Sequence, residues 1–334
     1  MVSHGLVLDL VERVGAVARH DTVSVPIPDG DTETARRAVA AWCARTGNEL
    51  VEITDGSVVV RRGPSVDHLA ELDPNQVPGT RLWIYTNFDC NLACDYCCAR
   101  SSPQADRNGL GLDRVRRLAA EAVDAGVSEL ILTGGEPFLL TDIDEVVQAC
   151  TVQLPTTLLT NGMLFRGRRL EALRRMDRSR LALQISLDSA TADLHDGHRG
   201  KGSWAKAVSG IQIARAEGFR VRVAATLPME RTRELGPFHE FLDGLGIEPG
   251  DQVIRTLAHR GFATEGIELT RESLIPEVTV TADGVYWHPV SAGHDDHLVT
   301  RKIFPLGGAI EDVRRQFVRL RADADSAAQW FPCA

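Results

Sequence analysis

The chain has 334 residues, of which 43% are hydrophobic, and its 46 Asp and Glu outnumber its 37 Lys and Arg to give a net charge of −9. This acidic balance excludes non-specific nucleic-acid binding, which requires clustered positive charge. No apolar run approaches the roughly 20 residues of a membrane span, and the N-terminus lacks the basic and apolar regions of a secretory signal. We therefore expect a globular cytoplasmic protein without a nucleic-acid or membrane partner.

Residues 1–75 form the first predicted domain, a small α+β unit. Its elements are expected in the order strand, helix, strand, strand, at residues 23–28, 32–45, 50–54 and 57–61. The last two strands flank Asp55-Gly56, which is a strong signal for a tight hairpin turn. A linker rich in Pro, Asn and Gly then leads to the next domain.

Residues 76–261 form the second predicted domain, in which short apolar runs alternate with helical segments. Strands are expected at 82–87, 129–133, 157–160, 181–187, 220–227 and 253–257, and helices at 112–125, 142–152, 168–176, 204–217 and 235–245. Such β-α repeats predict a parallel sheet with helices outside it and right-handed crossovers. The predicted fold class is α/β, a partial (β/α)6 barrel of the TIM type, with its chemistry where strands end.

Residues 262–334 form a predicted C-terminal extension. Strands at 277–281 and 285–288 flank Asp283-Gly284, which indicates a second hairpin. A helix is expected at 309–321.

The seven cysteines are Cys43, Cys90, Cys94, Cys97, Cys98, Cys150 and Cys333. A disulfide framework would space them more evenly, in a shorter secreted chain. Cys90, Cys94 and Cys97 instead follow the first barrel strand in the spacing C-x3-C-x2-C. Three soft thiolates in this pattern can hold three irons of a four-iron cluster and leave the fourth iron open. The alternative is a structural zinc site with Cys98 or a His as fourth ligand, although Cys98 directly follows Cys97.

The segment from Cys90 to Cys97, including the aromatic Tyr96, resembles the signature of the radical S-adenosylmethionine (SAM) superfamily. The resemblance implies a [4Fe-4S] cluster on the three cysteines, with SAM chelated to the open iron. It also implies that SAM is cleaved to a 5′-deoxyadenosyl radical, which abstracts hydrogen from a substrate. Tyr96 would then lie near the adenine, and an electron donor such as flavodoxin or ferredoxin would be a partner.

Motifs at the ends of later strands extend the resemblance. Gly134, Gly135 and Glu136 follow the second barrel strand, where glycines allow close backbone approach to a ligand. A carboxylate beside them can accept hydrogen bonds from an ammonium group, and in this family the motif binds the SAM amino group. The alternative is a turn without a ligand.

The third and fourth strands end in further polar residues. Asn161 resembles another feature of the family, and Ser186 and Asp188 stand where the family contacts the SAM ribose or carboxylate. Ser and Asp also favour strand-end turns. Arg199 lies in a segment similar to one in peptide-modifying members, where it would pair with the SAM carboxylate as a bidentate fork. A solvated loop arginine is the alternative.

Four residues are candidates for a catalytic role. Alternation along the sixth strand places Arg255 on one face with Val253 and Leu257, so that an inward Arg255 would need an acidic substrate group or a structural carboxylate as partner. His259 follows at the strand end as a possible general base. Cys98 and Cys333 are candidates to return a hydrogen atom to a substrate radical.

The extension is related to the SPASM and twitch types found in relatives, but it lacks their cysteines. A cysteine is expected near His288, and only Cys333 lies beyond residue 150. We therefore predict a radical SAM enzyme with one cluster that acts on a small polar metabolite. A peptide-modifying maturase is the alternative enzyme, and a zinc-stabilised binding module is the non-enzymatic alternative.

Overall fold

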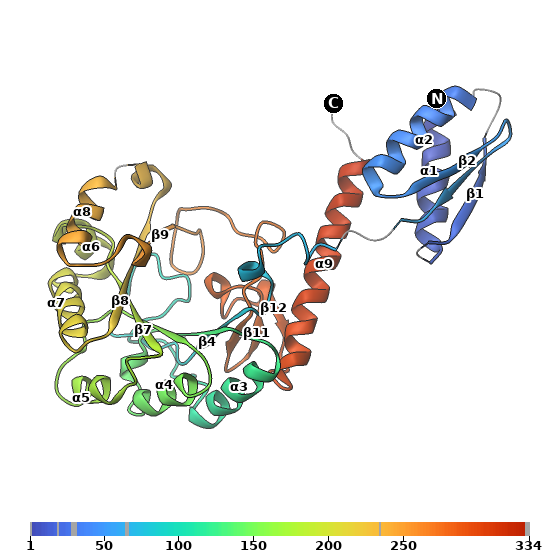
Figure 1. Cartoon of the computed structure of the whole chain (residues 1–334). Coiled ribbons are helices and arrows are strands. Elements are labelled where there is room, and N and C mark those ends of the chain that lie inside the picture. The colour runs from blue at the N-terminus through green and yellow to red at the C-terminus, as the bar shows by residue number, and fades with distance from the viewer. Residues whose placement is uncertain (1, 19, 28–31, 64–66, 234, 331–334) are drawn as a thin grey trace. The chain divides into compact units, whose positions relative to one another are not determined.

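The computed structural model describes residues 2–18, 20–27, 32–63, 67–233 and 235–330. These residues belong to two compact units (Figure 1). The first unit comprises residues 1–71 and 318–334, and the second comprises residues 72–317. No helix of the described ranges is both long and apolar enough to cross a membrane.

The first unit packs two helices against a three-stranded antiparallel sheet of order β1-β3-β2. Its elements are α1 (Val2–Ala16), β1 (Thr22–Pro26), α2 (Thr32–Thr46), β2 (Glu49–Ile53) and β3 (Ser57–Arg61). Alternate residues of β1, Val23 and Val25, are buried together with Leu6 and Leu10 of α1. Burial of these apolar side chains is the main source of the unit's stability.

Helix α1 is absent from the sequence prediction, and this is a correction. Its buried residues Leu6, Leu10 and Val14 recur every four positions, which is the period of a helix packed on one side. Valines and two glycines, both poor helix formers, weaken the signal in the sequence. Packing against the sheet stabilises the helix in spite of this composition.

The second unit contains a nine-stranded sheet of order β12-β11-β10-β4-β5-β6-β7-β8-β9. Its parallel strands are β4 (Arg81–Tyr85), β5 (Glu129–Thr133), β6 (Thr156–Thr160), β7 (Leu181–Ser186), β8 (Arg220–Leu227) and β9 (Gln252–Thr256). The connecting helices are α3 (Leu112–Asp124), α4 (Ile143–Thr151), α5 (Arg168–Arg175), α6 (Ala192–Arg199), α7 (Ser203–Ala216) and α8 (Gly236–Gly244). The predicted α/β fold with a partial barrel is confirmed, and in the described residues the sheet does not close.

The predicted C-terminal hairpin continues the barrel sheet. Strands β10 (Thr279–Thr281) and β11 (Gly284–Tyr286) pair as expected, and β12 (Leu298–Thr300) adds a third strand that the sequence did not indicate. β10 pairs in parallel with β4, so the extension lies beside the strand that leads to the cysteines. Helix α9 (Leu306–Trp330) begins earlier and ends later than expected. The division into three domains stays a prediction.

Helix α6 is a second correction, because the sequence prediction places no element between residues 187 and 204. Its last residues, His198 and Arg199, face the segment that carries the cysteines. The eight-residue helix is short and contains Gly197, so its helical signal in the sequence is weak.

Candidate active site

The three cysteines of the C-x3-C-x2-C segment line one cavity of about 650 Å³. They lie in the loop that follows β4, at the carboxyl end of the parallel strands. The cavity is also lined by Gly134 and Gly135 after β5 and by Ser186 at the end of β7. The structure thus brings residues from separate strand ends to one site, as expected for a barrel of this type.

The thiols are free, and their surroundings suit a metal cluster. Burial raises the pKa of Cys90 to about 12 and that of Cys94 to about 11. The thiolate forms that bind a metal are therefore stable here only when the positive charge of the metal offsets their negative charge. The Leu92 N–H donates to Cys90 Sγ at 3.4 Å, and the Ser101 N–H donates to Cys97 Sγ at 3.3 Å. Hydrogen bonds of this kind to sulfur are among the factors that tune iron–sulfur clusters.

A site for a single metal ion is not found among the residues that the structure describes. No group of three or more His, Cys, Asp or Glu side chains in those ranges is arranged to hold one ion. A four-iron cluster does not require such convergence, because each thiolate binds a different iron. The three thiolates that line the cavity are soft donors of the kind that fits a cluster with three protein ligands.

The two glycines after β5 allow the cysteine loop to approach. A Cβ on Gly134 would lie 2.4 Å from Asn87 Oδ1, and a Cβ on Gly135 would lie 2.2 Å from the Asp89 carbonyl oxygen. The Gly135 N–H donates to Asn87 O at 2.9 Å. Glycine is required here for close backbone contact between two strand ends.

The Glu136 carboxylate is fully buried and faces into the protein. It accepts hydrogen bonds from Thr160 Oγ1 at 2.7 Å, the Asn161 N–H at 2.8 Å and the Phe138 N–H at 3.0 Å. Glu136 therefore joins the ends of β5 and β6. The contact expected between this carboxylate and the SAM amino group stays a prediction, and the three internal bonds indicate a positioning role.

Asn161 connects the end of β6 to the cysteine loop. Its Nδ2 donates to Asn91 Oδ1 at 2.8 Å, between the first and second cysteines. Its Oδ1 accepts from the Met163 N–H at 3.0 Å, which fixes the orientation of the amide. Asn161 also lines the cavity and is available to a ligand there.

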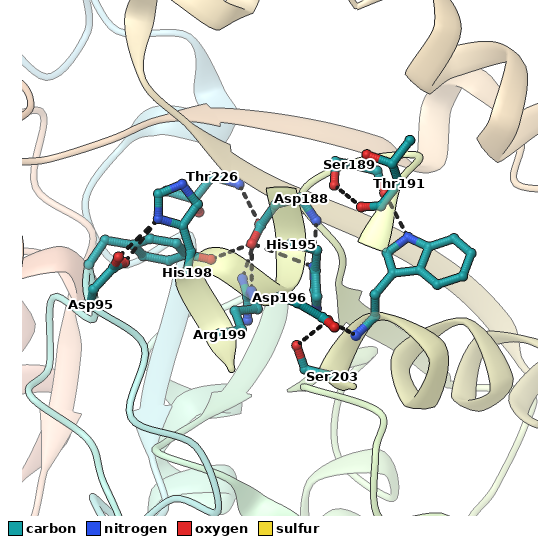
Figure 2. A network of polar contacts seen from close by, with 12 residues as sticks. Asp95, Asp188, Ser189, Thr191, His195, Asp196, His198, Arg199, Ser203 and Thr226 are labelled. Atoms are coloured by element: carbon teal, nitrogen blue, oxygen red, sulfur yellow. Dashed lines mark hydrogen bonds and ion pairs between the residues drawn. The ribbon is translucent and has the colours of Figure 1, made fainter. Parts of the chain in front are cut away.

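Asp188 is the centre of a buried polar network, which Figure 2 shows. The carboxylate accepts from Arg199 Nε at 2.6 Å and Nη2 at 3.1 Å, and from the Tyr96 hydroxyl at 2.5 Å. The Thr226 N–H adds a bond of 3.1 Å. The Arg199 guanidinium also lies 5.4 Å from the centre of the Tyr96 ring.

This network changes the role expected for Arg199. Two of its nitrogens are held by Asp188, so the bidentate fork predicted for the SAM carboxylate is occupied within the protein. Arg199 still lines the cavity, and the N–H groups that do not bond to Asp188 are left for a ligand. The predicted contacts of Asp188 and Arg199 with SAM stay predictions.

Electrostatics keep this pair ionised although Asp188 is only 3% exposed. Burial alone would raise the pKa of Asp188, but the charge of Arg199 and hydrogen bonds from Arg199, Tyr96 and Thr226 outweigh it and hold the pKa below its usual value. Burial lowers the pKa of His195 to about 4, so this imidazole is neutral. Its Nδ1 accepts from the Asp188 N–H at 3.1 Å, which places the ring proton on Nε2.

Helix α6 holds the cysteine loop through a second set of contacts. The Asp95 N–H donates to the His198 carbonyl at 3.2 Å, and His198 Nδ1 lies 3.0 Å from Asp95 Oδ2. The Tyr96 ring lies 5.7 Å from the His198 ring. Both residues before the third cysteine are therefore positioned by α6.

A second cavity, of about 180 Å³, adjoins this network. It is lined by Tyr96 and Asp188 together with apolar side chains such as Leu227, Leu257 and Phe262. An aromatic ring with apolar neighbours and a carboxylate suits a planar, partly polar group.

The catalytic candidates separate into two sets. Cys98 and Arg255 line the larger cavity, together with Val253 and Leu257 from the face that the alternation predicted. His259 is ion-paired with Glu268 and lines neither cavity. Cys333 lies outside the described residues.

Several residues of the site were missed in the sequence. Asn87, Asn91, His195 and His198 orient the predicted residues. Asn87 carried a detectable signal, since a polar residue directly follows a buried strand. His195 and His198 carried none, because α6 was not recognised as a helix.

The family model of the radical SAM superfamily matches residues 84–243. The antilisterial bacteriocin subtilosin biosynthesis protein AlbA of Bacillus subtilis is 34% identical over 140 residues, or 41% of this chain and 31% of AlbA. The AdoMet-dependent heme synthase of Methanosarcina barkeri is 31% identical over 47% of this chain and 45% of that protein. The mycofactocin maturase MftC of Mycobacterium tuberculosis is 32% identical over 47% of this chain and 39% of MftC.

The matches span less than half the length of each of these three relatives. Among solved structures, native anSMEcpe with bound AdoMet matches with a TM-score of 0.54 and 12% identity over 72% of this chain and 83% of that chain. At this identity the likeness shows the fold alone. The cysteine motif, the strand-end residues around it and the family match lead to one conclusion: residues 84–243 form a domain of the radical SAM superfamily.

Proposed function

We propose that Cys90, Cys94 and Cys97 hold a single [4Fe-4S] cluster and that the protein uses SAM to abstract hydrogen from a polar substrate in the 650 Å³ cavity. When bound, the cluster supplies the electron that cleaves SAM to a 5′-deoxyadenosyl radical. The observation that supports the proposal is that one cavity is lined by the three thiols together with Gly134, Gly135 and Ser186.

In this proposal, the chain's own residues bind SAM and orient it. Gly134, Gly135 and Asn161 offer backbone and amide groups to the amino-acid part of SAM, with Ser186 beside them. Tyr96, held by Asp188, borders the smaller cavity, which we assign to the adenine.

A small polar metabolite is the first candidate substrate. The substrate would occupy the part of the cavity that the cluster and SAM leave open. Its wall contains polar side chains from the strands, among them Thr157, Gln184 and Arg255. Reduction would come from a flavodoxin or ferredoxin in this proposal.

A peptide substrate is the second candidate. The relatives AlbA and MftC, named for bacteriocin biosynthesis and mycofactocin maturation, match the same part of the chain. Extracts separated by size into metabolites and peptides distinguish the two, because only the fraction that holds the substrate increases 5′-deoxyadenosine formation.

The proposal is tested on protein that has been reconstituted anaerobically with iron and sulfide. The expected result is about four irons per chain and formation of 5′-deoxyadenosine from SAM on reduction. Cys94→Ala should lose both, whereas the matched control Cys98→Ala should keep its iron, because Cys98 is not a ligand. A colourless protein that binds one zinc would overturn the proposal in favour of a zinc-stabilised module.

A further inference from the structure

Two arginines from neighbouring strands line the same wall of the 650 Å³ cavity. Arg222 lies on β8 and Arg255 lies on β9, and these strands pair in parallel with Thr226 opposite Arg255. Neither residue belongs to the motifs that we assign to the cluster or SAM. A role toward another group in the cavity is therefore open to both.

Within the described part of the chain, the acidic Glu277 acts on Arg255 through its charge but makes no ion pair or hydrogen bond with it. Arg255 makes no ion pair or hydrogen bond there, and its guanidinium lies 6.0 Å from the centre of the Trp83 ring. The Arg255 side chain is exposed in the cavity, where a carboxylate or phosphate group can reach its planar fork. A structural carboxylate in direct contact with Arg255 is not found among these residues.

Arg222 is only partly satisfied. Its Nε is buried and has no hydrogen-bond partner, and the nearest acidic atom, Asp251 Oδ1, lies 3.7 Å away. Asp251 is already held by Arg220, whose Nη2 donates to Oδ1 at 2.7 Å. A buried donor without an acceptor costs free energy, which a bound ligand can recover.

The other charged groups of this wall compensate the two arginines only in part. Glu277 pairs with Arg81 at 2.9 Å and also accepts from Trp83 Nε1. His288 is neutral, since burial lowers its pKa to about 4, and its Nδ1 accepts from the Val290 N–H at 3.3 Å. This leaves its Nε2–H as a further donor toward the cavity.

We infer that Arg255 and Arg222 bind an anionic group of the substrate, a carboxylate or a phosphate, with the His288 Nε2–H as an additional donor. The inference rests on the proposed function, since it concerns the substrate of the same cavity. Anionic oxygens match the planar fork of arginine and form the strong, charge-assisted kind of hydrogen bond. The substrate class is accordingly an organic acid or a phosphate ester.

The test measures anion binding by calorimetry on the reconstituted protein, first without SAM and then with saturating SAM. The probes are inorganic phosphate and glutarate, and glutaramide serves as the uncharged analogue of glutarate. We expect phosphate or glutarate to bind and glutaramide not to bind. The anion that binds tells a phosphate ester from a carboxylic acid.

The variants locate the binding. Arg255→Gln and Arg222→Gln should each weaken anion binding about tenfold or more, because each loses a charge-assisted contact. The control Arg116→Gln, on the outer helix α3, should bind as the wild type does. Arg255→Lys keeps the charge without the fork and should fall between the wild type and Arg255→Gln.

Four results would overturn the inference. These are no binding of either anion to the wild type, equal binding to Arg255→Gln, and binding that disappears when SAM is present, which would assign the arginines to SAM. The fourth is loss of iron from Arg255→Gln, which would show that Arg255 stabilises the charge of the cluster. Failure of the proposed function is separate, since it would appear as absent iron or absent SAM cleavage in the wild type.

Discussion

At the scale of single residues, Asp188 organises the site from a buried position. Its carboxylate holds Arg199 and Tyr96, which border the two cavities, and its own N–H orients His195. A buried ion pair is weak evidence for net stability, because both charges lose hydration. The removal of only one charge is costly, however, since the other is left buried and unpaired.

Asp188→Asn therefore tests this residue with little change in shape. We expect a loss of about 3 kcal/mol in the free energy of unfolding, because the Arg199 charge loses its partner. We also expect weaker SAM binding, because Tyr96 and Arg199 lose their anchor. Chemical denaturation and SAM titration measure the two effects.

The control for this substitution is Asp113→Asn, at a side chain that is 99% exposed. It should change neither quantity, because exposed ion pairs contribute little. If Asp188→Asn lowered stability but bound SAM as the wild type does, the network would be structural only.

At the scale of elements, α6 and α7 form a continuous support for the cysteine loop. Asp196 near the end of α6 caps the start of α7, where its carboxylate accepts from the Gly202 N–H at 2.6 Å and the Trp204 N–H at 2.8 Å. These are backbone donors that a helix start otherwise leaves unpaired. The hydrogen bond from Trp204 is the largest cause of a lowered Asp196 pKa.

Asp196→Ala should lower the free energy of unfolding by about 1–2 kcal/mol, because the cap is lost. Asp124→Ala is the matched control, since Asp124 ends α3 and a carboxylate is unfavourable near a helix C-terminus. Thermal unfolding followed by circular dichroism measures both. Equal stability of Asp196→Ala and the wild type would show that the cap contributes nothing.

At the scale of the whole molecule, buried neutral histidines link stability to pH. The pKa of His195 falls from 6.5 to about 4 on folding, so between these values the unfolded chain binds more protons than the folded chain. The stability that His195 contributes is therefore complete above pH 6.5 and is lost as the pH falls toward 4. His288 acts in the same direction.

We expect the titration of His195 alone to lower the free energy of unfolding by about 2 kcal/mol at about pH 5 compared with neutral pH. His195→Gln keeps an acceptor for the Asp188 N–H and removes the titration. Denaturation curves of this variant should accordingly depend less on pH than those of the wild type. An unchanged pH dependence would show that His195 does not contribute to it.

The cysteine motif, the glycines after β5 and the parallel barrel were predictable because their signals are local in the chain. The spacing of Cys90, Cys94 and Cys97 and the alternation of apolar runs with helical segments need no knowledge of distant contacts. The helices α1 and α6 were not predictable in this way. Both have weak intrinsic helical signals, and packing against neighbouring elements stabilises them.

The roles of the strand-end residues depended on the tertiary structure. Glu136 and Asp188 are acidic residues that follow buried strands. Such a position in the sequence is compatible both with ligand binding and with pairing inside the protein. Folding places Thr160 and Asn161 around Glu136, and it places Tyr96, 92 residues away in the chain, against Asp188. Residue type and spacing determined which chemistry the site can hold. The packing of distant segments decided which side chains remain available for it, because a buried polar group takes the partners that folding brings to it.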